Sequence, residues 1–178
     1  MAIPYRGNTG LGTYFITAST AGKQSLFQSE RMARLFVETL LHYRDQKKYW
    51  LHEFVLMPDH FHLLITPTES LERALQLIKG GFSFRARHEL GFIGEIWQSS
   101  FHDHRVRDVG EYERSRTYIH HNPVKRGLAA SPDAYPYSSA AGFVPDEVPQ
   151  RAKTDHIDGL NRFAKAAAPP QSAGANDR

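Results

Sequence analysis

Hydrophobic and polar positions alternate with two different periods along the chain. Four stretches are rich in β-branched and aromatic residues and predict strands, at 13–18, 50–57, 60–66 and 96–106. Apolar residues recur at helical spacing over 29–48 and over 69–90, which predicts two helices. The Pro58-Asp59 pair favours a tight turn between the second and third strands.

A third helix is expected after the fourth strand. Asp108, with Glu111 three residues later, resembles a capping box and marks the start of this helix. Pro123 restricts the residue before it, so we expect the helix to end near Asn122.

The predicted order is β-α-β-β-α-β-α. Its first six elements are the split-βαβ pattern of ferredoxin-like folds. We therefore expect an α+β, ferredoxin-like or RRM-like antiparallel sheet with helices packed on it and one added helix. Residues 1–144 form the expected domain. The composition changes at 145, and we expect the tail 145–178, with its Ala/Pro/Gly/Ser-rich end, to be largely disordered.

The amino-acid composition limits the kinds of site and partner that the protein can have. The 178 residues include no Cys, which excludes disulfides, Cys-ligated metals and a thiol nucleophile. The net charge of +3 allows an anionic partner such as nucleic acid but does not demand one. No apolar run is long enough for a membrane span or an export signal, so we expect a cytoplasmic protein.

Histidine is the more informative residue type. The chain has ten, and eight of them lie between positions 52 and 121. Histidine is the commonest metal ligand and the usual acid or base near neutral pH. His60 and His62 lie two positions apart on a predicted strand, so both face one side of the sheet and can converge on a cation. Alternatively, they are an ordinary pair of exposed or hydrogen-bonded histidines at a hairpin.

Tyr118 and Asn122 form a second candidate pair. They lie four positions apart on the predicted third helix and therefore share a face. A tyrosine hydroxyl can act as a nucleophile in phosphoryl transfer near a cation, and an amide oxygen one turn away can complete a metal site. Alternatively, the tyrosine is a packing residue and Asn122 caps the helix.

The amino-acid sequences of three segments then indicate a family. The segments are VLMPDHFHLLITP (55–67), WQSSFHDHRVRD (97–108) and YIHHNPVKRGL (118–128). They resemble the REP-associated tyrosine transposases, relatives of the single-tyrosine HUH transposases similar to insertion sequence 200. The resemblance covers about Gly12 to Phe143 and identifies residues 1–144 as an HUH transposase domain.

The resemblance implies a role for each matched residue. His60, His62 and Asn122 would bind a divalent cation, Mg²⁺ or Mn²⁺, and Tyr118 would be the nucleophile. Two imidazoles suit Mn²⁺ better than Mg²⁺, which prefers oxygen ligands. The implied activity is cleavage and rejoining of single-stranded DNA at hairpin-forming repeats through a 5′-phosphotyrosine intermediate. The implied partner is a repetitive-extragenic-palindrome-like hairpin in the nucleoid, met by a monomer or a homodimer.

Several residues beside these motifs are candidate DNA contacts: Arg105, Arg107, Lys125, Arg126 and His104. His120 and His121 follow the tyrosine but should point to other faces of the helix.

Three alternatives remain. The first is a DNA-hairpin-binding protein that has lost activity. The second, a histidine-triad hydrolase, needs a third His at position 64, which is Leu64. The third, an RRM-type RNA binder, needs exposed aromatics where the His pair lies.

Overall fold

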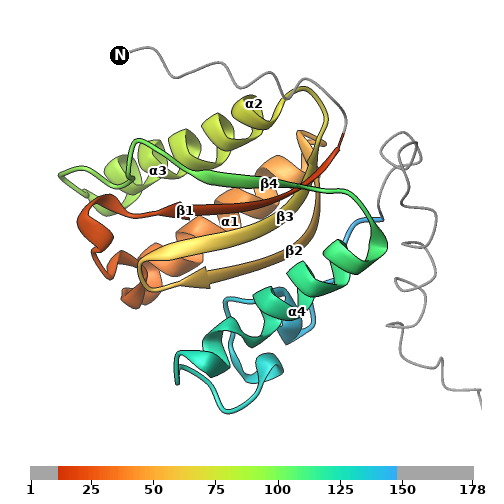
Figure 1. The fold of residues 1–178 in the computed structure, drawn as a ribbon. Helices are drawn as coiled ribbons and strands as arrows, with labels where there is room; N and C mark the ends of the chain where they lie inside the picture. The colour runs from red at the N-terminus through yellow and green to blue at the C-terminus, as the bar shows by residue number, and fades with distance from the viewer. Residues whose placement is uncertain (1–11, 148–178) are drawn as a thin grey trace, which may run out of the picture.

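A four-stranded antiparallel sheet lies at the centre of the computed structural model, which describes residues 12–147. Its strand order is β2-β3-β1-β4 (Figure 1). The strands are β1 (Thr13–Ser19), β2 (Tyr49–Met57), β3 (His60–Pro67) and β4 (His102–Val106). This topology confirms the predicted α+β split-βαβ fold. The expected disorder after 147 lies outside the described residues.

Helices cover both faces of the sheet. One face carries α1 (Glu30–Asp45), α2 (Leu71–Leu75), a π-helical turn (Gln76–Gly80) and α3 (Gly81–Leu90). The added helix α4 (Val109–Lys125) packs on the opposite face, against β2 and β3 (Figure 1). The described residues also contain four short 3₁₀ turns, at Ala21–Lys23, Leu26–Gln28, Pro132–Ala134 and Ser139–Ala141. In the described part of the chain, no helix has the length and apolar character needed to cross a membrane.

The main core lies between the sheet and α1–α3. Every second residue of β1 enters it, and its centre is an aromatic cluster with ring centroids 5.1–5.8 Å apart, made by Phe27, Phe36, Phe61, Phe82 and Trp97. A smaller apolar cluster lies under α4, where Ile119 and Tyr112 meet Val55 and Leu64. Because this second cluster is small, polar side chains occupy the rest of that face.

A β-bulge changes which residues of β2 face α4. Leu51 pairs with Ile65 and Glu53 pairs with Leu64, so β2 has one more residue than β3 between these two pairs. His52 and Glu53 consequently both reach the α4 face. His52 lies within hydrogen-bonding distance of Thr66, and Glu53 lies under α4.

Two predicted element boundaries are wrong. Pro123 lies inside α4 rather than ending it: Arg126 donates to the Asn122 carbonyl and Leu128 to that of Pro123, which closes one more turn. The fourth strand begins at His102 and not at residue 96, because Trp97 turns into the core and donates from Nε1 to the Lys79 carbonyl. Trp97 keeps only an isolated bridge to Thr20.

The segment after α4 returns along the edge strand β2. Leu56 donates to the Tyr137 carbonyl, and Leu51 donates to the Asp146 carboxylate, which also binds Arg44. Contacts with the domain therefore reach Asp146, two positions past the boundary expected at 144.

Candidate functional site

His60 and His62 form the centre of the candidate site, on the face of β3 that looks toward α4. Their ring centroids are 4.8 Å apart. Both side chains are buried, with 8% and 4% of their surface exposed. The expectation that they share one face is therefore confirmed, and they are close enough to approach one ligand together.

Each imidazole is held at its Nδ1 atom. The His60 Nδ1 atom lies 2.6 Å from the Asp59 carboxylate, and since a carboxylate only accepts, Nδ1 is the donor of this contact. The His62 Nδ1 atom lies 2.7 Å from the Thr17 hydroxyl, which its strand register places directly opposite. Such partners at the second ring nitrogen are the usual support of metal-binding histidines.

The His62 ring also has an unpaired buried nitrogen. Its Nε2 atom has no hydrogen-bond partner. Burial lowers the pKa of His62 to about 3, helped by the neighbouring His60 and Arg126. The ring is therefore neutral at neutral pH, which is the form that binds a metal ion. A buried polar atom without a partner is costly, and a cation would satisfy it.

Tyr118 reaches this pair from α4. Its ring centroid lies 5.1 Å from that of His62, and Phe15 packs against both rings, at 5.4 Å from His62 and 5.8 Å from Tyr118. The side chain of Lys125 lies over the Tyr118 ring, with Nζ 5.7 Å from its centroid. Tyr118 is 43% exposed, so a large substrate can reach it.

Asn122 lies one turn beyond Tyr118 on α4 and is buried. Within residues 12–147, no group of three or more His, Cys, Asp or Glu side chains is arranged so that it could hold a metal ion. A cation at this site would therefore depend on the two imidazoles together with amide or substrate oxygens. An open groove of about 560 Å³ runs beside Tyr118, lined by Glu113, Arg114, Thr117, His121 and Lys125.

The candidate DNA contacts divide into three places. Lys125 and Arg126 lie beside Tyr118 and His62. His104 and the backbone N–H of Arg107 both contact Glu111, in the first turn of α4. Arg105 is opposite Tyr14 in the sheet register, and Tyr14 belongs to the main core. Arg105 therefore projects from the face opposite the His pair.

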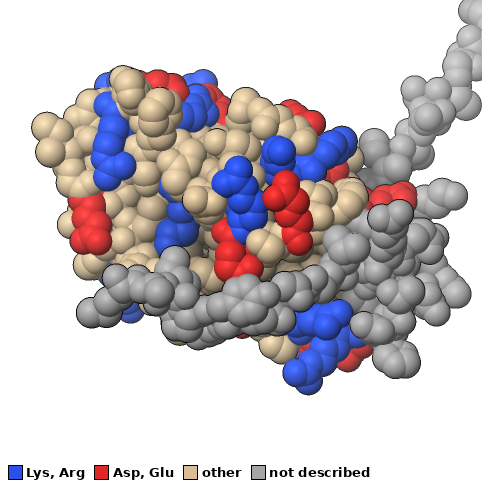
Figure 2. All heavy atoms as spheres, turned by 90° about the horizontal axis from the view of Figure 1, so that it is seen from above, with Lys and Arg blue, Asp and Glu red and all other residues tan. Residues whose placement is uncertain are grey.

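On the side of the molecule seen in Figure 2, the charges do not form one basic surface. On the face in Figure 2, Lys and Arg atoms are interspersed with Asp and Glu atoms. This pattern agrees with the modest net charge of +3.

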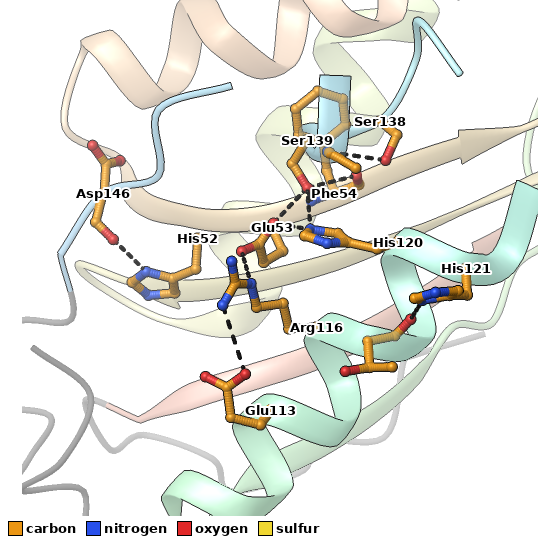
Figure 3. A network of polar contacts seen from close by, with 12 residues as sticks. His52, Glu53, Phe54, Glu113, Arg116, His120, His121, Ser138, Ser139 and Asp146 are labelled. Carbon is orange, nitrogen blue, oxygen red and sulfur yellow. Dashed lines mark hydrogen bonds and ion pairs between the residues drawn. The ribbon is translucent and has the colours of Figure 1, made fainter. Parts of the chain in front are cut away.

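Four residues of this face were not singled out from the sequence. Thr17 and Phe15 approach His62 only through the pairing of β1 with β3, and no local pattern indicates that register. Asp59 reads as a turn residue, although its position next to His60 was a usable signal. Glu53 is buried beneath α4 and binds three side chains (Figure 3), and only the bulge brings it there.

Comparisons with known proteins agree with this arrangement. Residues 11–122 match the family model described as "Transposase IS200 like". The REP-associated tyrosine transposase of Escherichia coli (strain K12) is 24% identical over 131 residues, which are 72% of this chain and 76% of that protein. A putative REP-associated tyrosine transposase of Haemophilus influenzae is 30% identical over 96 residues, 47% of this chain and 54% of its own length.

A solved structure gives the same fold. It is described as a REP-associated tyrosine transposase bound to a REP hairpin, and it superposes with a TM-score of 0.65 at 24% identity over 78% of this chain and 82% of that one. The chain belongs to the IS200-like transposase family. Its resemblance to the REP-associated tyrosine transposases, expected from three sequence segments, is confirmed.

Proposed function

We propose that this protein cleaves and rejoins single-stranded DNA next to hairpin-forming repeats, through a covalent link between Tyr118 and a 5′-phosphate. The observation that carries the proposal is the approach of an exposed helical tyrosine to a buried histidine pair, with 5.1 Å between the ring centroids of Tyr118 and His62. The hairpin partner is suggested by the relatives, one of which was solved with a REP hairpin.

The reaction balances without another reactant. The Tyr118 hydroxyl oxygen attacks the phosphorus and loses its proton to solvent. The bond from phosphorus to the 3′-oxygen breaks, and that oxygen takes a proton from solvent and leaves as a 3′-hydroxyl. A 3′-hydroxyl attacking the phosphotyrosine in the second step restores the tyrosine and joins the strand.

A divalent cation, Mg²⁺ or Mn²⁺, fits the donor atoms of this site. His60 and His62 would hold it through Nε2, the atom that lacks a partner in His62. For this, His62 must donate its Nδ1 proton to Thr17. Asn122 would add an amide oxygen. Such an ion supplies Lewis-acid stabilisation of a phosphate.

The protein's own groups prepare the remaining steps. Phe15 packs on both rings and limits their rotation. Lys125 and Arg126 place positive charge where a phosphodiester backbone would approach Tyr118. The open groove on the Tyr118 side of α4 provides room for a single strand.

The test is covalent capture. We expect the protein, incubated with a labelled single-stranded repeat hairpin and Mn²⁺, to give an adduct on a denaturing gel. Tyr118→Phe should give none while keeping hairpin affinity. Tyr112→Phe is the matched control, because this second tyrosine of α4 is buried in the apolar cluster and should leave the adduct intact. EDTA should abolish adduct formation, and added Mn²⁺ should restore it.

Two results would contradict the proposal. Tight hairpin binding without an adduct, across several repeats and metals, would favour a binding protein that has lost activity. An adduct of undiminished yield in Tyr118→Phe would assign the nucleophile to another residue.

A further inference from the structure

Glu53 is a buried carboxylate between the sheet and the tyrosine helix. Its side chain is 6% exposed. His120 donates to Oε2 at 2.7 Å, Ser139 donates to Oε2 at 2.6 Å, and the Nε atom of Arg116 lies 3.2 Å from Oε1. Figure 3 shows the three side chains converging on Glu53 from α4 and from the segment that follows it. Both carboxylate oxygens are thus satisfied, as a buried charge requires.

These partners hold α4 from one flank. Residues of a helix are separated by about 100° of rotation, so Arg116 and His120 share one side of α4 and Tyr118 points the other way. Ile119 faces the sheet between them and is fully buried. Rotation of α4 about its axis would therefore break the Glu53 contacts and move Tyr118 away from His62 together.

Apolar packing alone would restrict the rotation of α4 about its axis only weakly. The apolar cluster under α4 is small, with Tyr112 and Ile119 as its buried members from the helix. Apolar contacts are not directional, whereas the bonds to Glu53 are. Ser139 extends the same network to the returning segment, where its hydroxyl also accepts from the Phe54 N–H.

The network is not a hydrolytic triad, although it contains Ser, His and Glu. One atom, His120 Nε2, faces both the Glu53 carboxylate at 2.7 Å and the Ser139 hydroxyl at 3.5 Å. Ser139 is buried and donates to the carboxylate. Its oxygen therefore has neither an activating base nor access to a substrate.

The geometry points to Glu53 as a positioning residue for Tyr118: through Arg116 and His120 it fixes the rotation of α4, and so the approach of the nucleophile to the histidine pair. The catalytic consequence rests on the proposed function. The mechanical consequence, a helix held in one rotation, does not. The two parts can be measured separately.

The experiment compares the wild type with Glu53→Gln, which keeps the side-chain volume but replaces one acceptor oxygen by a donor and removes the charge. Hydrogen exchange read by mass spectrometry should show faster exchange in α4 peptides covering 112–125 and unchanged exchange in β1 and β3. With hairpin DNA at saturation, the rate of adduct formation should fall roughly 10- to 100-fold, the effect expected of a misplacement near 1 Å. Hairpin affinity should stay within about threefold, since a positioning role acts after binding.

Asp146→Asn is the matched control. Asp146 is a second carboxylate against β2, partly buried, and its side chain bonds Arg44 and the Leu51 N–H rather than residues of α4. This variant should lower the melting temperature while leaving α4 exchange and adduct rate unchanged. If it slows the adduct as much as Glu53→Gln does, the effect is one of stability and the inference fails.

Other outcomes are equally decisive. Wild-type protection of α4 in Glu53→Gln, or faster exchange with an unchanged adduct rate, would overturn the inference. If the wild type forms no adduct with any hairpin, the proposed function fails, and α4 exchange still decides whether Glu53 fixes the helix.

Discussion

Thr17 controls the orientation of His62, because its hydroxyl is the partner of the Nδ1 atom, at 2.7 Å. We expect Thr17→Val to weaken Mn²⁺ binding about 10- to 100-fold, the usual cost of removing such a support. Isothermal titration calorimetry measures this directly. Thr17→Ser keeps the hydroxyl and should bind like the wild type. Unchanged affinity in Thr17→Val would show that packing against Phe15 alone orients the ring.

The buried His52 should make the free energy of unfolding depend on pH. Its Nδ1 donates to the Asp146 carbonyl, so its Nε2 accepts from Thr66, and burial lowers the pKa of the ring. Below pH 6.5 the unfolded chain takes up a proton that the folded ring resists. Stability should therefore be constant above pH 6.5 and fall below it, with a slope from this group of up to about 1.4 kcal/mol per pH unit.

The measurement for His52 is urea unfolding between pH 5.5 and 7.5 in EDTA. His62 has a lowered pKa as well and contributes with the same sign, so the comparison with His52→Gln isolates His52. The variant should be less stable at pH 7.5, with a flatter dependence on pH. Parallel pH profiles for the two proteins would contradict the assignment.

The position of a site residue could be predicted from the sequence where it follows from a local sequence pattern. His60 and His62 share a face because of the strand period, and Tyr118 approaches them once α4 crosses that face. Thr17 and Glu53 depend on strand register and on a bulge, which long-range pairing decides. No pattern within either strand contains that information.

At the scale of elements, the start of α4 is set by Asp108. Its side chain accepts from the Glu111 N–H at 2.8 Å, as the capping signal predicted, while the Glu111 carboxylate reaches back to the Arg107 N–H. Asp108→Ala should lower the free energy of unfolding by about 1 kcal/mol, and Asp108→Ser should restore most of it. Thermal unfolding monitored by circular dichroism tests this. An equal loss in both variants would mean that the charge, and not the cap bond, matters.

Element order was predictable because strands and helices have different periods, and element ends were less so. Pro123 was expected to stop α4, yet donors from Arg126 and Leu128 bond the carbonyls around it and keep the last turn. The fourth strand was predicted too long because Trp97 has strand-like chemistry but is drawn into the aromatic core. In both cases tertiary contacts outweighed a local preference.

At the scale of the whole molecule, the two faces of the sheet have different tasks. The face under α1–α3 holds most of the buried apolar residues. The face under α4 holds a small apolar cluster and the polar side chains of the site. Stability therefore depends mainly on one face, which leaves the other free to carry buried polar groups that a core would not tolerate.

This difference between the two faces of the sheet predicts which basic side chains contribute to DNA binding. Lys125 and Arg126 lie on the side of the histidine pair, whereas Arg105 projects from the face of Tyr14. Each phosphate contact changes the slope of log affinity against log salt by about 0.7 for single strands and 0.9 for duplex DNA.

In a Tyr118→Phe background, where binding is separated from cleavage, Lys125→Ala and Arg126→Ala should each reduce the slope by about that amount. Arg105→Ala should leave it unchanged. Fluorescence anisotropy between 50 and 200 mM salt, about the range over which such contacts are resolved, measures all three. An equal loss in Arg105→Ala would mean that the DNA also wraps around the β4 edge, so that both faces of the sheet take part in binding.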